Sequence, residues 1–381
     1  MQCYIKDRRN AYRRLGDYIR EVDVRNKDLK VTRLVGLTIE KAFIPSVANV
    51  IGTDLSNYKV IKKEQFACSL MQVSRDGRMP VAMFEGDMPA IMSPAYPLFE
   101  VIDTTKLLPQ YLMMWFSRKE FDREACFYAV GGVRGSLTWE DFCDMTLPIP
   151  PIARQREIVS EYEMLTNRIR LNNRMISTLE STAQALYRKM FVDNIDKDNL
   201  PEGWRMGILG EIAEITMGQS PDGESYNEEE FGEIFYQGRT DYGYRFPSVR
   251  MYTSMPQRMA RAGDILLSVR APVGDLNITL HDCCIGRGLA AVRSKIKCNS
   301  FLFYMLQTKN SELNISNDDG TIFGSITKED LFNLQVTIPQ NKHIFAFNKK
   351  AKIIDNGIQI KDNENKVLTE LQSLLLAKME L

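Results

Sequence analysis

The chain contains one internal repeat, and this repeat is the feature that most restricts how its 381 residues can fold. Residues 135–142 (GSLTWEDF) reappear as residues 324–331 (GSITKEDL). Upstream of each copy, residues 15–17 (LGD) correspond to residues 209–211 (LGE). Because the motifs keep their order in both halves, we expect two globular domains built on one plan.

Each half has the same order of parts. Short apolar runs bounded by Gly, Pro, Asn and Asp, such as residues 264–269, predict a β-rich globular part, and a long amphipathic segment after it predicts a helix. The expected fold class is α+β, with two pseudo-repeated mixed α/β domains separated by two long helices that form an antiparallel coiled coil. The predicted boundaries are 1–151 for the first globular domain, 152–192 for the central helix, 193–204 for a linker, 205–342 for the second globular domain and 343–381 for the C-terminal helix.

The two long segments repeat apolar residues at alternating steps of four and three, which is the pattern of a coiled-coil seam. The first seam comprises Ile158, Tyr162, Leu165, Ile169, Asn172, Ile176, Leu179, Ala183, Leu186 and Met190. The second comprises Phe347, Ala351, Ile354, Ile358, Lys361, Asn365, Leu368, Gln372, Leu375 and Met379. A rod of roughly 35 residues at about 1.5 Å each is longer than a lid over a small domain requires. The alternative is that each helix only caps its own domain.

Composition excludes several classes of protein. The formal net charge is zero, which argues against coating nucleic acid through an overall basic field. The 7 cysteines are odd in number and contain no CxxC pair, so neither a disulfide framework nor a thiolate zinc site is expected. No apolar run approaches the roughly 18 residues of a membrane span, and the charged N-terminus does not look like a signal peptide. We therefore expect a cytoplasmic protein.

The order of parts and several local motifs resemble the specificity subunit of type I restriction–modification systems. Residues 200–204 (LPEGW) look like the opening of a domain in that family. Residues 262–274 (AGDILLSVRAPVG) with residues 284–290 (CIGRGLA) look like its target-recognition core, and residues 147–152 (LPIPPI) are similar to the start of its central helix. The resemblance covers nearly the whole chain.

The resemblance implies that each globular domain is a target-recognition domain that reads one part of a split, double-stranded DNA target, while the paired helices set the gap. It also implies partner subunits: methyltransferase (modification) subunits that methylate adenine, and a motor-nuclease (restriction) subunit. S-adenosylmethionine, ATP and Mg are expected on those partners, with no cofactor and no metal on this chain. By this resemblance the chain is not an enzyme by itself.

The first half departs from the family pattern. It lacks Pro-x-Gly-Trp before Leu15, and it has residues 91–96 (IMSPAY) where the second half has Arg270 and Arg287. The two domains should therefore be of different recognition types. Before the last helix, residues 339–342 (PQNK) lack the double proline, which leaves the start of that helix open.

Base reading in DNA requires Arg, Lys, Asn or Gln side chains on a frame that enters the major groove. In the second half the predicted DNA-binding residues are Tyr236, Gln237, Arg239, Tyr242, Tyr244, Arg245, Arg250, Arg270 and Arg287. In the first half, two polar turns supply Arg75, Arg78 and Arg134. Each segment is alternatively an ordinary solvated loop, and Arg270 and Arg287 could instead brace the domain internally, because each adjoins an apolar strand.

Catalytic and cofactor motifs are missing from the sequence. It has no Asn/Asp-Pro-Pro-Tyr/Phe motif to hold a flipped adenine and no GxxxxGK[ST] loop, and the single GxG at residues 286–288 is typical of a tight turn. The 2 histidines, His281 and His343, leave little material for general-base or metal chemistry. We therefore expect a DNA-recognition subunit. The alternatives are a coiled-coil adaptor that binds only proteins and a self-contained DNA-modifying enzyme.

Overall fold

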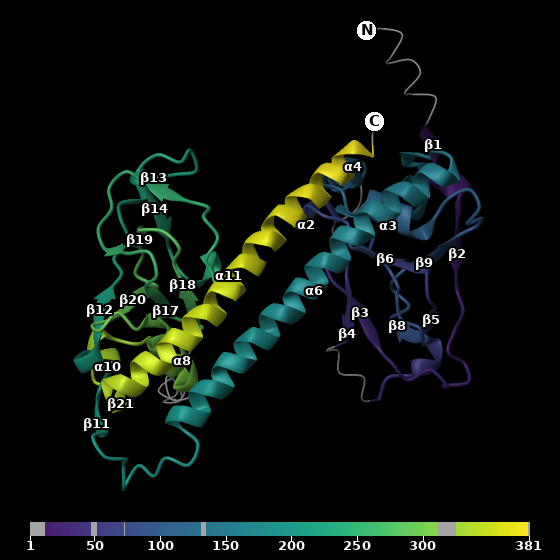
Figure 1. Cartoon of the computed structure of the whole chain (residues 1–381). Coiled ribbons are helices and arrows are strands. Elements are labelled where there is room, and N and C mark those ends of the chain that lie inside the picture. The colour runs from purple at the N-terminus through teal and green to yellow at the C-terminus, as the bar shows by residue number, and fades with distance from the viewer. Residues whose placement is uncertain (1–11, 47–51, 72, 131–134, 311–324, 380–381) are drawn as a thin grey trace. The chain divides into compact units, whose positions relative to one another are not determined.

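A computed structural model describes residues 12–46, 52–71, 73–130, 135–310 and 325–379 (Figure 1). The chain divides into two compact units: unit 1 comprises Met1–Asn172 with Glu364–Leu381, and unit 2 comprises Asn173–Asn363. Two long helices, α6 (Ile152–Phe191) and α11 (Asn341–Lys378), each contribute one segment to each unit. The predicted mixture of helices and strands is confirmed, and so is the long helix beginning at residue 152. Among the helices of the described ranges, none has the length and apolar character of a membrane span.

Unit 1 is built from short antiparallel strands covered by helices. Its strands are β1 (Tyr12–Arg14), β2 (Ile19–Val22), β3 (Val35–Leu37), β4 (Phe43–Pro45), β5 (Lys59–Ile61), β6 (Phe66–Cys68), β7 (Val81–Met83), β8 (Ala90–Met92), β9 (Leu98–Val101) and β10 (Thr146–Pro148). Its shorter helices are α2 (Val73–Asp76), α3 (Pro109–Phe116), α4 (Lys119–Ala129) and α5 (Trp139–Asp144). The main sheet has the order β2-β9-β6-β7, and β1–β10, β3–β4 and β5–β8 form separate pairs.

Aromatic side chains form the centre of the unit 1 core. Phe66 and Phe99 stack across neighbouring strands with ring centroids 5.0 Å apart, and Phe116 of α3 meets Phe66 edge-on. The start of α6 is fixed to this unit by Gln155, which is fully buried. Its side-chain oxygen accepts a hydrogen bond from the Leu108 backbone amide at 2.9 Å, and its side-chain NH₂ donates to two backbone carbonyls. The buried polar side chain therefore has partners for its donors and its acceptor.

The described residues of unit 2 form three sheets (Figure 1). Its strands are β11 (Arg205–Ile208), β12 (Ala213–Met217), β13 (Tyr226–Asn227), β14 (Glu233–Tyr236), β15 (Tyr252–Thr253), β16 (Met259–Ala260), β17 (Ile265–Ser268), β18 (Leu276–Ile278), β19 (Cys283–Ile285), β20 (Leu289–Ser294) and β21 (Gln335–Ile338). Its shorter helices are α7 (Leu209–Ile212), α8 (Asn299–Thr308) and α10 (Lys328–Phe332). One sheet has the order β12-β20-β17-β18, a second has the order β13-β15-β14-β19-β16, and β11 pairs with β21.

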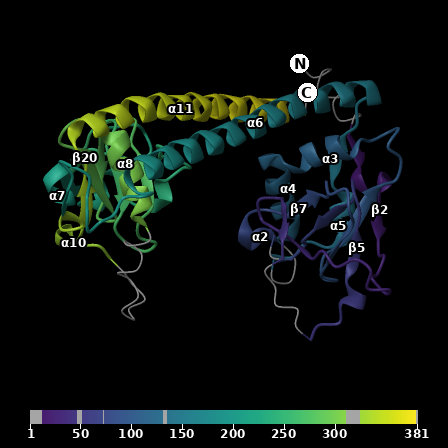
Figure 2. The ribbon, with the colours of Figure 1, turned by 60° about the horizontal axis from the view of Figure 1, so that its bottom comes forward.

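The core of unit 2 packs the sheet β12-β20-β17-β18 against both long helices. Helix α8 lies beside β20 (Figure 2). Tyr187 of α6 and Phe347 of α11 meet edge-on at 5.5 Å, and Phe191 and Phe301 complete the same aromatic cluster. All four side chains are at most 5% exposed, so this cluster anchors both helix segments to the unit.

The long helices contact one another within each unit. In unit 1, Asn172 donates a side-chain hydrogen bond to Asn365 at 3.0 Å, and Gln372 donates to Thr166 at 2.7 Å. In unit 2, Ile176 and Ile358 belong to one buried cluster. The residues of both predicted seams are buried or half-buried.

The repeated GSxT motif forms the same local structure wherever it is described. Thr138 precedes α5 and accepts a hydrogen bond from the Asp141 amide at 3.0 Å. Thr327 precedes α10 and accepts one from the Asp330 amide at 3.2 Å. A hydroxyl at this position satisfies a backbone amide that the first helical turn cannot pair, which explains why threonine stands at both positions.

Candidate nucleic-acid interface

Arg270 and Arg287, which lie just after β17 and just before the paired strand β20, line one hollow of about 460 Å³ in unit 2. The other lining residues are Met217, Val269, Ala271, Ser325 and Ile326. Both arginines are exposed, and neither forms an ion pair with another residue in the described part of the chain. The exposure of both side chains favours the DNA-facing alternative over internal bracing. Two uncompensated guanidinium groups on one concave surface suit an anionic ligand.

Backbone hydrogen bonds set the positions of these two arginines. Arg270 follows β17, where the Val269 amide donates to Gly288 at 2.9 Å and the Val269 carbonyl accepts from Ile326 at 3.0 Å. Arg287 lies in the turn between β19 and β20, and its amide donates to the Ser220 hydroxyl at 3.3 Å. The GxG motif at residues 286–288 is thus part of a tight turn, as the sequence indicates.

Close backbone approach at this turn requires glycine. A Cβ added at Gly286 would lie 2.7 Å from the Gln237 carbonyl oxygen, and one added at Gly218 would lie 2.1 Å from the Gly286 carbonyl oxygen. Because Gly286 has no side chain, the loops that carry Gln237 and Arg287 lie in direct contact. The glycines thereby place Gln237, whose side-chain amide is predicted to contact bases, next to the turn that carries Arg287.

The loop after β14 is organised by the buried carboxylate of Asp241, which is 4% exposed. It accepts hydrogen bonds from the Gln237 amide at 2.8 Å and from the Arg250 guanidinium at 3.1 and 2.5 Å. The Gln237 side chain and much of Arg250 remain exposed. Arg239 is also exposed but pairs with Asp275, so its charge is partly compensated.

Three residues of the predicted set are largely buried in the fold. Arg245 and Tyr236 are each 1% exposed, and Tyr242 is mostly buried. Burial raises the pKa of Tyr236 and that of Tyr242, so both phenols stay neutral. Their burial favours a supporting role within the loop, and DNA contact by these three residues stays a prediction. Tyr244 is 63% exposed and remains a candidate.

In unit 1 the described residues of the two weaker sequence signals approach each other at Ser74 and Gly135. Arg75 and Arg78 are exposed at the end of α2, and Arg75 pairs with Asp76 at 2.8 Å. A Cβ added at Gly135 would lie 2.0 Å from the Ser74 hydroxyl oxygen, so the two predicted loops touch. Arg134 lies outside the described residues.

The sequence did not indicate a hollow in unit 1 that is lined by Arg33, Lys41 and Glu85. Arg33 and Lys41 line a volume of about 360 Å³ together with Phe43 and Phe84. Lys41 pairs with Asp122 at 2.8 Å, and burial lowers the pKa of its ammonium group. No local motif marks these residues, because the hollow is assembled from separate strands and loops.

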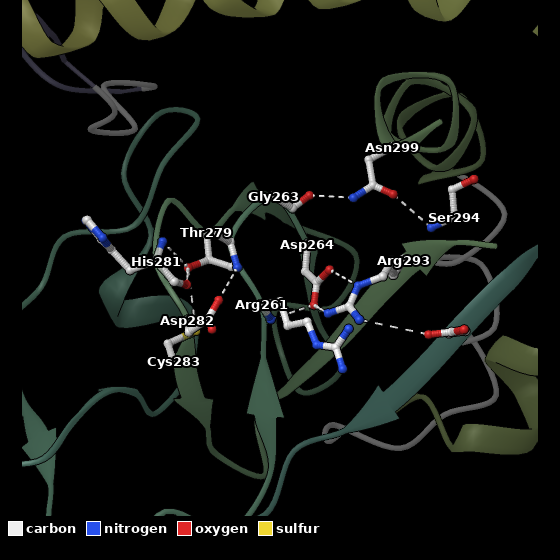
Figure 3. Close-up of polar contacts among 12 residues, drawn as sticks. Arg261, Gly263, Asp264, Thr279, His281, Asp282, Cys283, Arg293, Ser294 and Asn299 are labelled. Atoms are coloured by element: carbon white, nitrogen blue, oxygen red, sulfur yellow. Dashed lines mark hydrogen bonds and ion pairs between the residues drawn. The ribbon is translucent and has the colours of Figure 1, made fainter. Parts of the chain in front are cut away.

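A polar network closes the other end of strands β17 and β20 (Figure 3). The Asp264 carboxylate accepts two hydrogen bonds from Arg293, at 2.6 and 2.5 Å, and one from the Arg261 amide at 2.8 Å. Asp264 is 2% exposed, so Arg293 has a structural role in fixing the strand ends.

The His281-Asp282-Cys283-Cys284 segment contains residue types that can bind metals. The Cys283 thiol lies against the Thr279 hydroxyl at 3.5 Å, and burial raises its pKa to about 12 (Figure 3). Within the residues that the structure describes, no group of three or more His, Cys, Asp or Glu side chains could hold a metal ion.

Comparison with known proteins shows which proteins this chain is similar to. Residues 201–373 match the model of the type I restriction modification DNA specificity domain. The chain is 29% identical over 373 residues to the putative type I restriction enzyme MjaX specificity subunit of Methanocaldococcus jannaschii, a match that covers 92% of this chain and 87% of the relative. It is 23% identical over 266 residues to the MjaVIII specificity subunit of the same organism, covering 62% of this chain and 61% of that protein.

A solved structure has the same fold. The type I restriction–modification system S subunit from M. genitalium superposes with a TM-score of 0.59 at 15% identity, covering 97% of this chain and 95% of that one. Residues 201–373 are thus similar to a type I DNA specificity domain, and most of the chain is similar to a type I specificity subunit, as its sequence motifs indicate.

Proposed function

We propose that the chain recognises a two-part DNA sequence, and that the hollow holding Arg270 and Arg287 is a DNA contact of the second unit. The two exposed guanidinium groups that line one hollow, without an ion pair to any described residue, are the observation that carries this proposal. Each guanidinium offers a planar set of donors that matches a phosphate or the O6/N7 edge of guanine. The exposed Gln237 side chain beside them has the donor and acceptor needed to read adenine.

Each unit reads one part of the target in this proposal. The matched Thr138 and Thr327 helix starts, together with the matched pairs β1–β10 and β11–β21, support a structural repeat with the domain boundaries predicted from sequence. In unit 1 the corresponding readers are Arg75, Arg78 and Arg134. Arg33 is an additional candidate because it lines an open hollow.

The two long helices pair as an antiparallel coiled coil in this proposal and hold the two readers at a set distance. The seam contacts within each unit, including Asn172 with Asn365 and Ile176 with Ile358, support it. A polar pair in an otherwise apolar seam favours one register, because a shifted register would bury an amide without its partner.

The chain acts as the non-catalytic reader of a larger complex in the cytoplasm. Methyltransferase subunits would carry S-adenosylmethionine, and a motor-nuclease subunit would carry ATP and Mg. The sequence supports this division of labour, because it lacks the motifs for base flipping and for nucleotide hydrolysis.

The test is sequence-specific binding by the purified full chain. Duplexes selected by the chain from a random pool would be titrated at several salt concentrations against unrelated competitor DNA, because only the sequence-independent part of binding is strongly salt-dependent. A preference for a split target supports the proposal. No duplex binding would favour the protein adaptor, and methyl transfer or cleavage by the pure chain would favour a self-contained enzyme.

A further inference from the structure

Arg245, which belongs to the second unit's candidate recognition loop, is held between the two long helices. Its guanidinium donates to Glu180 of α6 at 3.3 Å and to Asp355 of α11 at 2.7 Å. It also donates to the Tyr304 hydroxyl at 3.1 Å and stacks over the Phe303 ring at 3.5 Å from its centroid. One side chain of the loop thus bonds to both helices while the core excludes water from it.

The next residue strengthens the same anchor. Phe246 is 6% exposed and packs with Ile176 of α6 and Ile358 of α11 in one buried cluster. Consecutive residues of the loop therefore contact both helices through an ion pair and through apolar packing. The backbone here is also tied to the sheet, because the Ile278 amide donates to the Arg245 carbonyl at 2.9 Å.

The anchor and the exposed readers belong to one short, internally bonded loop. The Ser248 amide donates to the Asp241 carbonyl at 2.8 Å, and the Asp241 side chain holds the Gln237 amide and the Arg250 guanidinium. A shift of Arg245 relative to the helices would therefore move the exposed side chains as well.

We propose that Arg245 is a positioning residue that couples the recognition loop, residues 237–250, to the register of the two helices. The inference rests on the proposed DNA recognition by this unit. A guanidinium buried between two carboxylates on different helices keeps its bonds in few arrangements, because each bond depends on angle as well as distance. Base reading by unit 2 thus depends on how α6 and α11 face each other at Glu180 and Asp355.

The test compares Arg245→Met with the double variant Glu180→Gln/Asp355→Asn in the full chain. The second variant leaves Arg245 in place but removes both charges that orient it. For each protein, the affinity for the selected duplex is measured beside duplexes altered in the half-site of unit 2 or of unit 1. We expect discrimination in the half-site of unit 2 to fall about tenfold or more, the effect of losing a good base contact. Discrimination in the half-site of unit 1 and affinity for unrelated DNA should stay within about twofold.

Arg118→Met is the matched control. Arg118 is similarly buried, at 2% exposed, and stacks on an aromatic ring, that of Trp115 at 4.1 Å, but it lies in unit 1. It should destabilise the protein without altering the half-site of unit 2. Wild-type discrimination in both folded test variants would overturn the coupling, whereas a wild-type chain without sequence preference would overturn the proposed function itself. Circular dichroism of every variant identifies those that are folded.

Discussion

Neutralising Arg270 and Arg287 tests the candidate interface most directly. The variant Arg270→Gln/Arg287→Gln removes two exposed positive charges from one hollow of about 460 Å³ and keeps polar side chains of similar length there. Both side chains are exposed, and no ion pair within the described residues depends on them, so we expect the free energy of unfolding to change by less than about 0.5 kcal/mol. A loss of binding would then report on the contact and not on folding.

The size of the effect follows from counterion release. Each phosphate contact contributes about 0.9 to the slope of log affinity against log salt concentration. Two lost contacts reduce that slope by about 1.8, so the loss of affinity between about 50 and 200 mM salt becomes about 12-fold smaller than in the wild type. If one arginine reads guanine instead, discrimination at one base pair should fall by about 1–3 kcal/mol.

Fluorescence anisotropy with a labelled duplex measures both quantities across a salt series. The control is Arg188→Gln/Arg205→Gln, which removes the same charge from two exposed arginines of unit 2 that do not line the hollow. If the test variant and the control keep the same slope and the same base discrimination as the wild type, the hollow does not contact DNA.

Three further predictions concern stability and spacing. Phe347→Ala, which empties a fully buried aromatic site, should lower the free energy of unfolding in urea by about 3–5 kcal/mol, whereas Phe345→Ala, 50% exposed on the same helix, should cost less than about 0.5 kcal/mol. Thr327→Ala should cost about 1 kcal/mol at pH 7. Hydrogen bonds from Thr327 lower the pKa of Asp330, so the stabilisation by this contact is complete above the ordinary carboxyl pKa and is lost as the pH falls through the lowered pKa of Asp330. The measurement is the difference in free energy of unfolding between the wild type and Thr327→Ala from pH 7 to pH 2; a difference that does not decline with pH would contradict the prediction. Adding one heptad to each helix, near Asn172 and Lys361, should lengthen the preferred spacer between half-sites by about 10 Å, or roughly three base pairs; an unchanged spacer at full affinity would show that the helices do not set the distance.

The sequence predicted the parts of the fold that depend on local pattern. The seam spacing located α6, and the repeated motif containing Thr138 and Thr327 marked two helix starts, because such signals come from neighbouring residues. The similarity to type I specificity subunits was also predicted from the order of the motifs.

The candidate site was only partly predictable because burial depends on distant partners. Arg245 and Arg270 have similar local surroundings in the sequence, each beside apolar residues. Only the fold shows that Arg245 meets Glu180 and Asp355, while Arg270 points into an open hollow. Arg33 gave no signal because its neighbours in the hollow come from separate segments.

The pairing of β11 with β21 has a consequence for how such a protein evolves. These strands lie at the two ends of the second recognition segment, and Ile208 is in register with Gln335. Paired strands are about 4.8 Å apart, so the segment between residues 208 and 335 begins and ends at neighbouring positions. A recombination event between related genes could therefore replace that whole segment with junctions at a single pair of strands. Such an exchange would give the host a new DNA specificity in one step, provided that the incoming loop also carries an arginine able to meet Glu180 and Asp355.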